Sequence, residues 1–127
     1  MINIPIKIVY DILSNSETFK DYNIYLMDVD EDFSKLDTLL PIIRINEVNS
    51  YQNGFSSNLP NSMSISTQVD IWAKSIKELN NIYYEIDKVM AKEGWACYTS
   101  GIDKDTDFND TPRIYKRYRT QQQINFA

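Results

Sequence analysis

Apolar and polar residues alternate along residues 63–72 of this chain. The odd-numbered positions are apolar or threonine, and the even-numbered positions are serine, glutamine and aspartate, with Trp72 as the exception. Successive side chains of a β-strand point to opposite faces, so this period of two predicts a strand with one buried face. Trp72 would then lie on the polar face, where we expect it to be available for contacts.

Residues 76–90 follow a different period, with apolar side chains at every third or fourth position, which places them on one stripe of a helix. The stripe comprises Ile76, Leu79, Ile82, Tyr83, Ile86, Val89 and Met90. Ser75 and Glu78 fit a capping box, in which the serine hydroxyl accepts a hydrogen bond from a free backbone N–H. Gly94 can adopt the left-handed conformation that ends a helix. We therefore expect a helix that begins at Ser75 and ends before Gly94.

A second, shorter helix is predicted near the start of the sequence, over residues 4–13. Asn3 is a favourable cap, Pro5 suits the first helical turn, and the apolar residues at positions 6, 9, 10 and 13 would share one face. This helix should be short and amphipathic.

The other apolar segments predict strands. They are residues 23–27, 39–48, 95–100 and 113–125, which are rich in β-branched or aromatic side chains. Pro41 should lie at the beginning of its strand or on an edge, with Ile43, Ile45 and Val48 toward the core. Residues 49–61 are rich in serine, asparagine and glycine, and residues 101–112 are rich in aspartate. Both segments are predicted to be loops.

The resulting order is helix, three strands, helix, two strands. Runs of strands with only two helices between them favour an α+β fold, in which one mostly antiparallel sheet of about five strands is covered on one face by both helices. A length of 127 residues is typical of one domain, so residues 1–127 are expected to form a single α+β domain. The opposite sheet face would carry uncharged polar groups, aromatics and arginines, which are common in protein interfaces.

Composition narrows the function classes. Histidine is absent, which removes the usual general base and the commonest nitrogen ligand of transition metals. Cys97 is the only cysteine, so no intrachain disulfide can form. The net charge of −5 argues against unspecific binding along a nucleic-acid backbone. The sequence begins without the pattern of a signal peptide and contains no apolar run of membrane-spanning length. We expect a cytoplasmic protein that is no enzyme and holds no cofactor.

Two clusters of charged residues are candidates for chemical sites. Asp103, Asp105 and Asp107 have the spacing that begins an EF-hand loop, but Phe108 and Ile114 occupy the positions of the required glycine and bidentate glutamate. We expect a solvated acidic turn there, with weak cation binding as the alternative. In a strand, Arg113, Arg117 and Arg119 lie on one face, with Lys116 and Tyr118 on the other. This stripe of arginines favours a protein interface over a nucleic-acid site, because the chain as a whole is acidic. Cys97, without a histidine to activate it, is expected to be a small buried hydrophobe.

The segment Lys92-Glu93-Gly94-Trp95 follows a strand and a helix, and precedes an aspartate-rich loop and the final strand Ile114-Tyr115-Lys116-Arg117-Tyr118-Arg119. In this arrangement residues 62–125 resemble the tail terminator proteins of long-tailed siphovirus bacteriophages, some of which are called minor tail or tail-completion proteins. Before residue 62 only the order of elements supports the resemblance, and the first helix matches no motif of the family.

The resemblance implies a viral structural protein of the virion tail, assembled in the host bacterial cytoplasm. It would form a homo-oligomeric ring, expected to be a hexamer, that caps the tail tube protein and presents a surface to the head–tail connector protein. DNA would pass through the lumen without specific binding, and no membrane is involved. A head-completion or connector adaptor remains an alternative, as does a small cation- or nucleic-acid-binding module. The interaction candidates are Tyr51, Asn53, Phe55, Asn58, Trp72, Asp103, Asp105, Asp107, Arg113, Arg117 and Arg119.

Overall fold

The computed structural model describes residues 3–29, 36–56 and 59–123 and contains a five-stranded sheet. Its strands are β1 (Asn23–Leu26), β2 (Ile42–Ser56), β3 (Leu59–Trp72), β4 (Ala96–Asp105) and β5 (Thr111–Gln123). In space they follow the order β1-β2-β3-β5-β4. All neighbouring strands are antiparallel except β1 and β2, which are parallel. The predicted α+β class with a mostly antiparallel sheet is confirmed.

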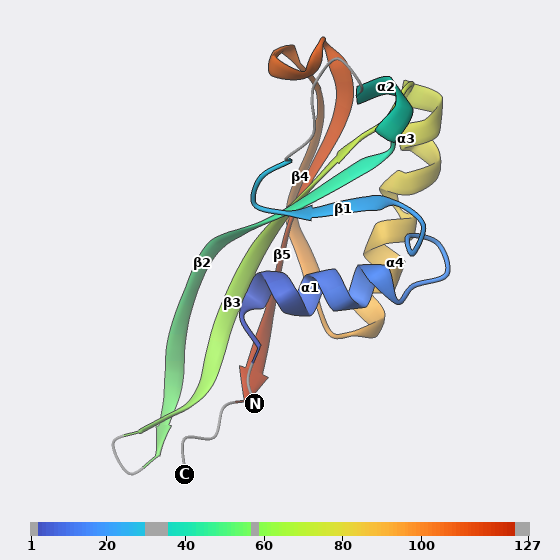
Figure 1. Cartoon of the computed structure of the whole chain (residues 1–127). Coiled ribbons are helices and arrows are strands. Elements are labelled where there is room, and N and C mark those ends of the chain that lie inside the picture. Colours follow the sequence, from blue (N-terminus) through green and yellow to red (C-terminus); the bar gives the residue numbers. More distant parts are fainter. Residues whose placement is uncertain (1–2, 30–35, 57–58, 124–127) are drawn as a thin grey trace.

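The helices gather on one face of this sheet (Figure 1). They are α1 (Pro5–Ser14), α3 (Ile76–Tyr83) and α4 (Glu85–Lys92), and a short helix α2 (Leu36–Leu39) precedes β2. The sequence predicted one helix where α3 and α4 lie, and it did not predict α2. The helix is interrupted between α3 and α4 at Tyr84, although the φ and ψ angles of this residue stay close to helical values. The break leaves the apolar stripe on the same side of both segments.

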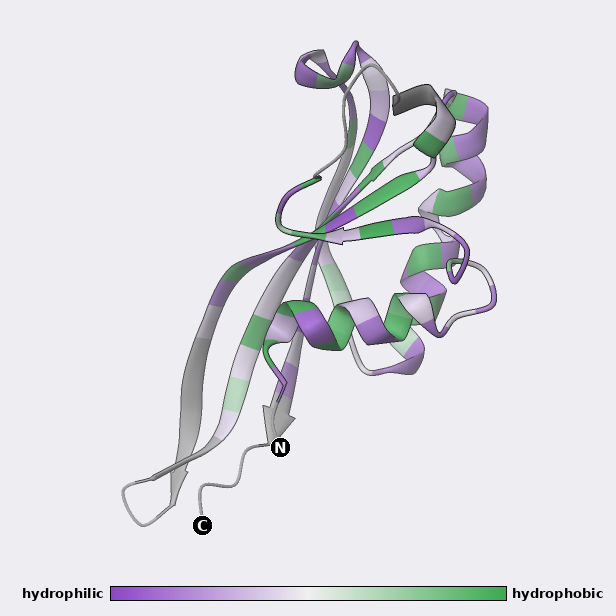
Figure 2. Ribbon diagram, viewed as in Figure 1, coloured by the Kyte–Doolittle hydropathy of each residue, from purple (hydrophilic) through white to green (hydrophobic). Residues whose placement is uncertain are grey.

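The main hydrophobic core lies between the helices and the sheet. Strand residues Ile43, Ile45, Ile65, Val69 and Ile71 pack there against Val9, Leu13, Leu79, Ile82, Ile86 and Met90 of the helices. The alternation in β3 and most of the apolar stripe of α3 and α4 are therefore used as predicted. Ile76, the first residue of the predicted stripe, is the exception: it lies at the start of α3 and is 55% exposed. Figure 2 shows the same amphipathic pattern in α1, whose segments alternate between hydrophobic and hydrophilic along its length.

The helix boundaries follow local chemistry with one exception. The Ser75 hydroxyl accepts a hydrogen bond from the backbone N–H of Glu78 at 3.2 Å, as the capping box predicts. Gly94 has a positive φ of 84°, a conformation that glycine adopts without strain. Asn3, in contrast, is not the cap of α1: the cap is Ile4, with no side-chain hydrogen bond, and Pro5 begins the helix. The fixed φ of proline suits this start even without a polar cap.

The predicted loop over residues 49–61 is instead a β-hairpin, which is the largest departure from the sequence prediction. β2 continues to Ser56 and β3 begins at Leu59, with cross-strand pairing from Ile42 opposite Trp72 to Ser56 opposite Leu59. Backbone hydrogen bonds do not depend on side-chain type, so a ladder that begins in the core can continue through residues with turn-like composition. We call the part of this hairpin formed by residues 49–56 and 59–66 the hairpin arm, and Figure 1 shows it extending away from the helices.

Two further predictions about loops and strands were wrong. Residues 101–112 are not one loop, because β4 runs to Asp105, a 3₁₀ turn covers Thr106–Phe108, and β5 begins at Thr111. Val48 does not face the core: the pairing of β2 with β3 shifts register between Glu47 and Asn49, and Val48 is 38% exposed. A bulge adds one residue to a strand and interrupts the alternation of its faces.

Candidate interaction surface

The sheet face opposite α1, α3 and α4 carries every arginine of the sequence. Arg44 comes from β2, whereas the other three arginines come from alternate positions of β5. Their neighbours on β3 and β4 are polar or aromatic. We define the arginine face as Arg44, Gln68, Asp70, Tyr98, Asp103, Asp105, Arg113, Tyr115, Arg117 and Arg119.

Asp70 is the centre of this face and has no solvent exposure. Its carboxylate lies 3.1 Å from Arg44 Nη2 and 3.4 Å from Arg113 Nη1, and it accepts a hydrogen bond from the Gln68 amide at 3.0 Å. The two guanidinium groups supply the opposite charge next to this buried carboxylate, whose burial would otherwise be costly. Asp70 thus links β2, β3 and β5 through side chains.

The other edge of the Arg113 guanidinium group faces β4. Arg113 Nε and Nη2 donate hydrogen bonds to the Asp103 carboxylate at 2.9 and 2.7 Å. This bidentate hydrogen bonding lowers the pKa of Asp103 and raises the pKa of Arg113. Arg113 is therefore held between two carboxylates, and its orientation is set before any partner arrives.

Trp72 lies on this side of the sheet, as its position in the alternation predicts, but it is not exposed. The indole is fully buried against Phe108 and Ile42, and its Nε1 donates a hydrogen bond to Asp105 at 3.0 Å. Leu39 and Leu40, at the end of α2 and just after it, and Phe108, in the 3₁₀ turn between β4 and β5, pack in the same cluster as Trp72. The expectation of an accessible Trp72 is therefore wrong: the residue forms a small second core.

Arg117 and Arg119 differ from the other two arginines because neither forms an ion pair with a carboxylate of the described residues. Arg117 Nε donates to the Gln68 side-chain oxygen at 3.0 Å, and the Arg119 guanidinium stacks 5.4 Å from the centroid of the Tyr98 ring. Tyr98 also shares a hydrogen bond with Ser66. Both arginines are exposed, so this part of the face presents two cations that carboxylates have not neutralised.

A hollow of about 580 Å³ adjoins Arg119 at the base of the hairpin arm. Its lining combines the Arg119 cation and the Tyr98 ring with hydroxyl and amide groups of Ser64, Ser66, Asn49 and Gln121. Val48, exposed by the bulge, lies at its border. The mixture of one cation, an aromatic ring and neutral polar groups matches the composition of protein interfaces.

Gly101 permits close packing on the β4 side of the face. A Cβ atom at this position would overlap the ring and hydroxyl of Tyr115, its partner across β4 and β5. Tyr115 in turn lies 5.5 Å from the Arg113 guanidinium, measured to the ring centroid. Glycine thus allows the tyrosine to lie flat on β4 while it contacts Arg113.

Apart from Trp72 and Asp107, the sequence-predicted candidates divide into three groups. Arg113, Arg117 and Arg119 share one face, as their alternation predicted, and the structure adds Asp103 and Asp105 to the same face. Tyr51, Asn53 and Phe55 lie in the β2 strand of the hairpin arm, opposite Ser64, Ser62 and Pro60. Asn58 lies outside the described residues. The face candidates and the arm candidates are brought to neighbouring parts of the same sheet.

The acidic triplet does not converge on one point. Asp103 binds Arg113, whereas Asp105 accepts hydrogen bonds from Trp72 Nε1 and from the backbone N–H of Asp107. Asp105 acts as the cap of the short 3₁₀ turn Thr106–Phe108. Over residues 3–29, 36–56 and 59–123, no group of three or more His, Cys, Asp or Glu side chains is arranged to hold a metal ion. Two of the three aspartates are used within the fold.

The helix side of β5 carries a second charged cluster, which the sequence did not single out. Lys116 is 1% exposed, and its ammonium lies 2.8 Å from the Asp87 carboxylate and 3.7 Å from the Tyr83 ring centroid. Tyr118 is fully buried and donates a hydrogen bond to the same carboxylate at 2.6 Å. Asp87, from α4, therefore fastens that helix to β5. Cys97 packs beside this core in a half-buried position, and burial raises the pKa of its thiol.

The cluster predicts a fall in stability at alkaline pH. Burial, and then the hydrogen bond to Asp87, raise the pKa of Tyr118 above its usual 10.0. Above about pH 10 the unfolded chain loses this phenolic proton while the folded chain keeps it, so the free energy of unfolding should decrease as pH rises. Urea denaturation at a series of pH values between about 8 and 11 measures this slope. Tyr118→Phe should make the slope shallower, and an unchanged slope would contradict the assignment.

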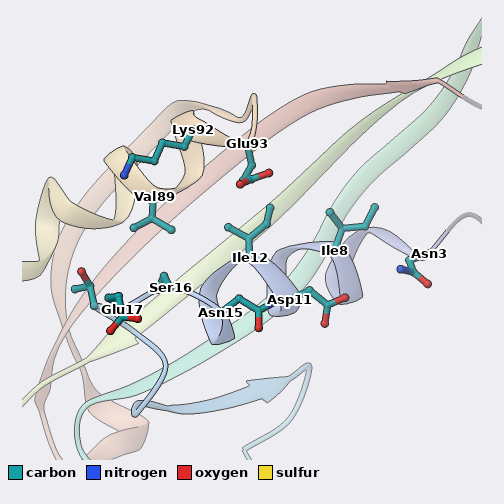
Figure 3. A pocket seen from close by; sticks show the side chains of 11 residues that line it. Asn3, Ile8, Asp11, Ile12, Asn15, Ser16, Glu17, Val89, Lys92 and Glu93 are labelled. Atoms are coloured by element: carbon teal, nitrogen blue, oxygen red, sulfur yellow. The ribbon is translucent and has the colours of Figure 1, made fainter.

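A second hollow, of about 550 Å³, lies between α1 and α4 on the helix side. Figure 3 shows Ile12 of α1 and Val89 of α4 pointing toward one another across it. Charged residues surround this apolar floor, with three carboxylates and one ammonium: Asp11, Glu17, Glu93 and Lys92. We call it the α1–α4 groove. Within the part of the chain that the structure describes, Glu93 forms no ion pair.

Sequence reasoning missed Arg44, Gln68 and Asp70 as members of the site. A signal was present, because each of them occupies the polar register of a strand otherwise rich in apolar residues. A charged residue in that register of a central strand requires a partner from a neighbouring strand. The pairing of β2 with β3 and of β3 with β5 supplies that partner, and the sequence alone does not specify this pairing.

Comparisons with known proteins add no assignment. A scan of the sequence against protein-family models finds no match, and a search of curated proteins finds no significant relative. Among the described helices, none is both long enough and apolar enough to cross a bilayer. Function must therefore be argued from the surface itself.

Proposed function

We propose that this protein is a structural subunit of a bacteriophage tail, a tail terminator that forms a ring on the end of the tail tube and presents the surface joined to the head connector. It works through binding and geometry, without covalent chemistry. The proposal unites the resemblance of residues 62–125 to tail terminators with two features of the described residues that suit assembly: a long edge of β2 to which no strand pairs, and a sheet face that α1, α3 and α4 do not cover.

The hairpin arm is the observation that carries the proposal. β1 pairs only with Ile42–Ile45 of β2, so among the described residues no strand pairs with the outer edge of β2 from Asn46 to Ser56. A long strand edge with unpaired backbone groups is a template for pairing with another chain. Natural monomers usually keep such edges short or cover them. An extended hairpin with a free edge therefore favours a role in assembly.

The arginine face supports the same class of function. It combines arginine and tyrosine side chains, and its carboxylates already have partners within the fold. Arginine and tyrosine are enriched among the residues that contribute most to the binding energy of interfaces. The free edge and the arginine face lie on the same sheet, so one subunit can offer two different contact surfaces. Heterologous contacts of that kind generate rings when their rotation closes.

A head-completion or connector adaptor is the second candidate. It would use the same surfaces and would differ in ring number and in the protein bound. A cation- or nucleic-acid-binding module is the third candidate, and it finds less support because Arg44 and Arg113 are already paired with carboxylates. Tight binding of Ca²⁺ or an oligonucleotide by a protein that never assembles would favour this third candidate.

The first experiment measures the absolute mass of the purified protein by light scattering after size exclusion, over a range of concentration and salt. We expect a species near six subunits, either in solution or on addition of isolated tail tubes. The matched variant replaces residues 53–62 with Asn-Gly, which closes the hairpin at the paired Gln52 and Met63. This shortened arm should abolish assembly while circular dichroism and the melting temperature stay close to those of the parent.

The possible results of that experiment support different conclusions. Assembly that is lost with the arm supports a subunit whose hairpin joins copies or partners. A protein that stays monomeric at every concentration and also fails to bind tail-tube protein contradicts the tail terminator. A ring of another number that binds only the head connector favours the adaptor.

A further inference from the structure

We propose that the arginine face of one copy of this chain docks on the helix side of a second copy, with Arg117 and Arg119 facing the acidic α1–α4 groove. The proposal rests on the proposed function, since it names the surfaces through which the subunits of the ring meet. The structure supports it through the distribution of charge, the unpaired groups on each surface and the positions of the two surfaces in the fold.

The charge of the chain is unevenly distributed over its surface. The arginine face carries four arginines against three aspartates, whereas the other charged residues of the sequence are nine lysines and fifteen acids. The arginine face thus has a small positive balance, whereas the rest of the sequence has an excess of acids. A second copy of the chain consequently offers a surface of opposite charge, and complementary potentials of this kind both accelerate association and fix orientation.

Each surface contains charged groups that the fold itself leaves without an opposite charge. On the arginine face these are Arg117 and Arg119, which contact Gln68 and Tyr98 but no carboxylate of the described residues. In the α1–α4 groove, Glu93 has no cationic partner over the described ranges. Glu17 and Asp11 each form an ion pair with an exposed lysine of their own segment, Lys20 and Lys7. Arginine forms two-pronged hydrogen bonds with carboxylates, so these groups are chemically matched.

Both surfaces also offer shape and apolar area. The hollow beside Arg119 is bordered by the exposed Val48 and Tyr98, and the α1–α4 groove has the apolar floor of Ile8, Ile12 and Val89. Figure 3 shows the charged residues of the groove around these aliphatic side chains. An apolar centre with a charged border is the usual anatomy of a specific interface.

The geometry of the fold makes this contact heterologous. α1 and α4 cover one face of the sheet, and the arginine face is the other (Figure 1). A copy that docks on one side leaves its own opposite side available for the next copy. Repetition of the same contact produces a closed ring or an open array. A contact between two arginine faces would instead stop at a dimer and would bring like charges together.

Two charge-reversal variants test the docking directly. The face variant is Arg117→Glu/Arg119→Glu, and the groove variant is Glu17→Lys/Glu93→Lys. All four residues are exposed, so both variants should retain the circular dichroism spectrum and melting temperature of the parent. The control Lys74→Glu/Lys77→Glu makes the same charge change as the face variant, at exposed positions beside the start of α3.

Self-association is measured by sedimentation over a concentration series at low and physiological salt. Each variant alone should associate at least about tenfold more weakly than the parent, because each places like charges at the contact. An equimolar mixture of the two variants should regain association, since the acidic face then meets the basic groove and the basic face meets the acidic groove. The control should behave as the parent, and added salt should weaken the parent.

Other outcomes overturn the docking and separate it from the function. If the parent assembles but the face variant assembles equally well, the contact is elsewhere and the ring proposal stands. If the mixture fails to associate while each variant alone is impaired, the two surfaces do not meet. If the parent is monomeric throughout, docking between copies is refuted. If Arg117→Glu/Arg119→Glu abolishes binding of a labelled oligonucleotide without changing assembly, the face is a nucleic-acid site.

Discussion

Asp87→Ala is expected to lower the free energy of unfolding by about 3–5 kcal/mol, because it removes the carboxylate that pairs with the buried Lys116 ammonium. Lys116, which is 1% exposed, would keep its contact with the Tyr83 ring but lose its anionic partner. Tyr118 would lose the acceptor of its hydroxyl as well. The cost is large because a buried ammonium and a buried hydroxyl are left without partners at the same time. Urea denaturation followed by circular dichroism measures the change.

A second substitution distinguishes the ion pair from general damage to α4. Lys116→Met fills a similar volume without a charge, so Asp87→Ala/Lys116→Met should be more stable than Asp87→Ala alone. Glu85→Ala removes only the exposed pair with Lys88 on the same helix and should cost less than about 1 kcal/mol. If Glu85→Ala and Asp87→Ala lower the free energy of unfolding equally, the pair of Asp87 with Lys116 stabilises the fold no more than an exposed ion pair does.

Asp70→Ala is expected to destabilise the domain by about 2–4 kcal/mol and to loosen the arginine face. The carboxylate has no solvent exposure and lies between Arg44 and Arg113, so its removal leaves two guanidinium groups facing each other without the intervening anion. Both arginines are about one-fifth exposed and can reach water, which makes the expected loss smaller than for Asp87. Denaturation gives the free energy, and hydrogen exchange reports the loosening of β2, β3 and β5.

The control variants separate charge from packing at this position. Asp70→Asn keeps the volume of the side chain, so a loss close to that of Asp70→Ala would identify the charge as the cause. Asp103→Ala removes the carboxylate at the exposed end of Arg113, which keeps Asp70, and should cost less than about 1 kcal/mol. An effect of Asp103→Ala as large as that of Asp70→Ala would mean that the network is not centred on the buried aspartate.

Local patterns in the sequence were sufficient for the elements that form the main core. The alternation of residues 63–72 and the stripe of residues 76–90 each specify a period and a buried side, and the structure uses both. The separation of Arg113, Arg117 and Arg119 from Lys116 and Tyr118 followed from the same alternation. These features need only the geometry of one strand or one helix.

The failures concern features that depend on a partner strand. Residues 49–61 have the composition of a loop, yet the ladder between β2 and β3 continues through most of them because each strand satisfies the backbone groups of the other. Trp72 was expected to be exposed, yet Phe108 and Leu40, which are distant in sequence, cover it. Neither outcome can be derived from the period of a single segment.

The sequence by itself determined the class of the fold, the core faces of β3, α3 and α4, and the fact that arginine alternates along the last strand. Only the tertiary structure decided that Arg44 and Asp70 join those arginines, that Asp87 fastens α4 to β5, and that the hairpin extends away from the helices. The physical reason is the separation along the chain over which each feature is specified. Periodicity records which side of one element is buried, whereas the partner of a buried charge is chosen by strand order and register, which bring together residues far apart in the chain.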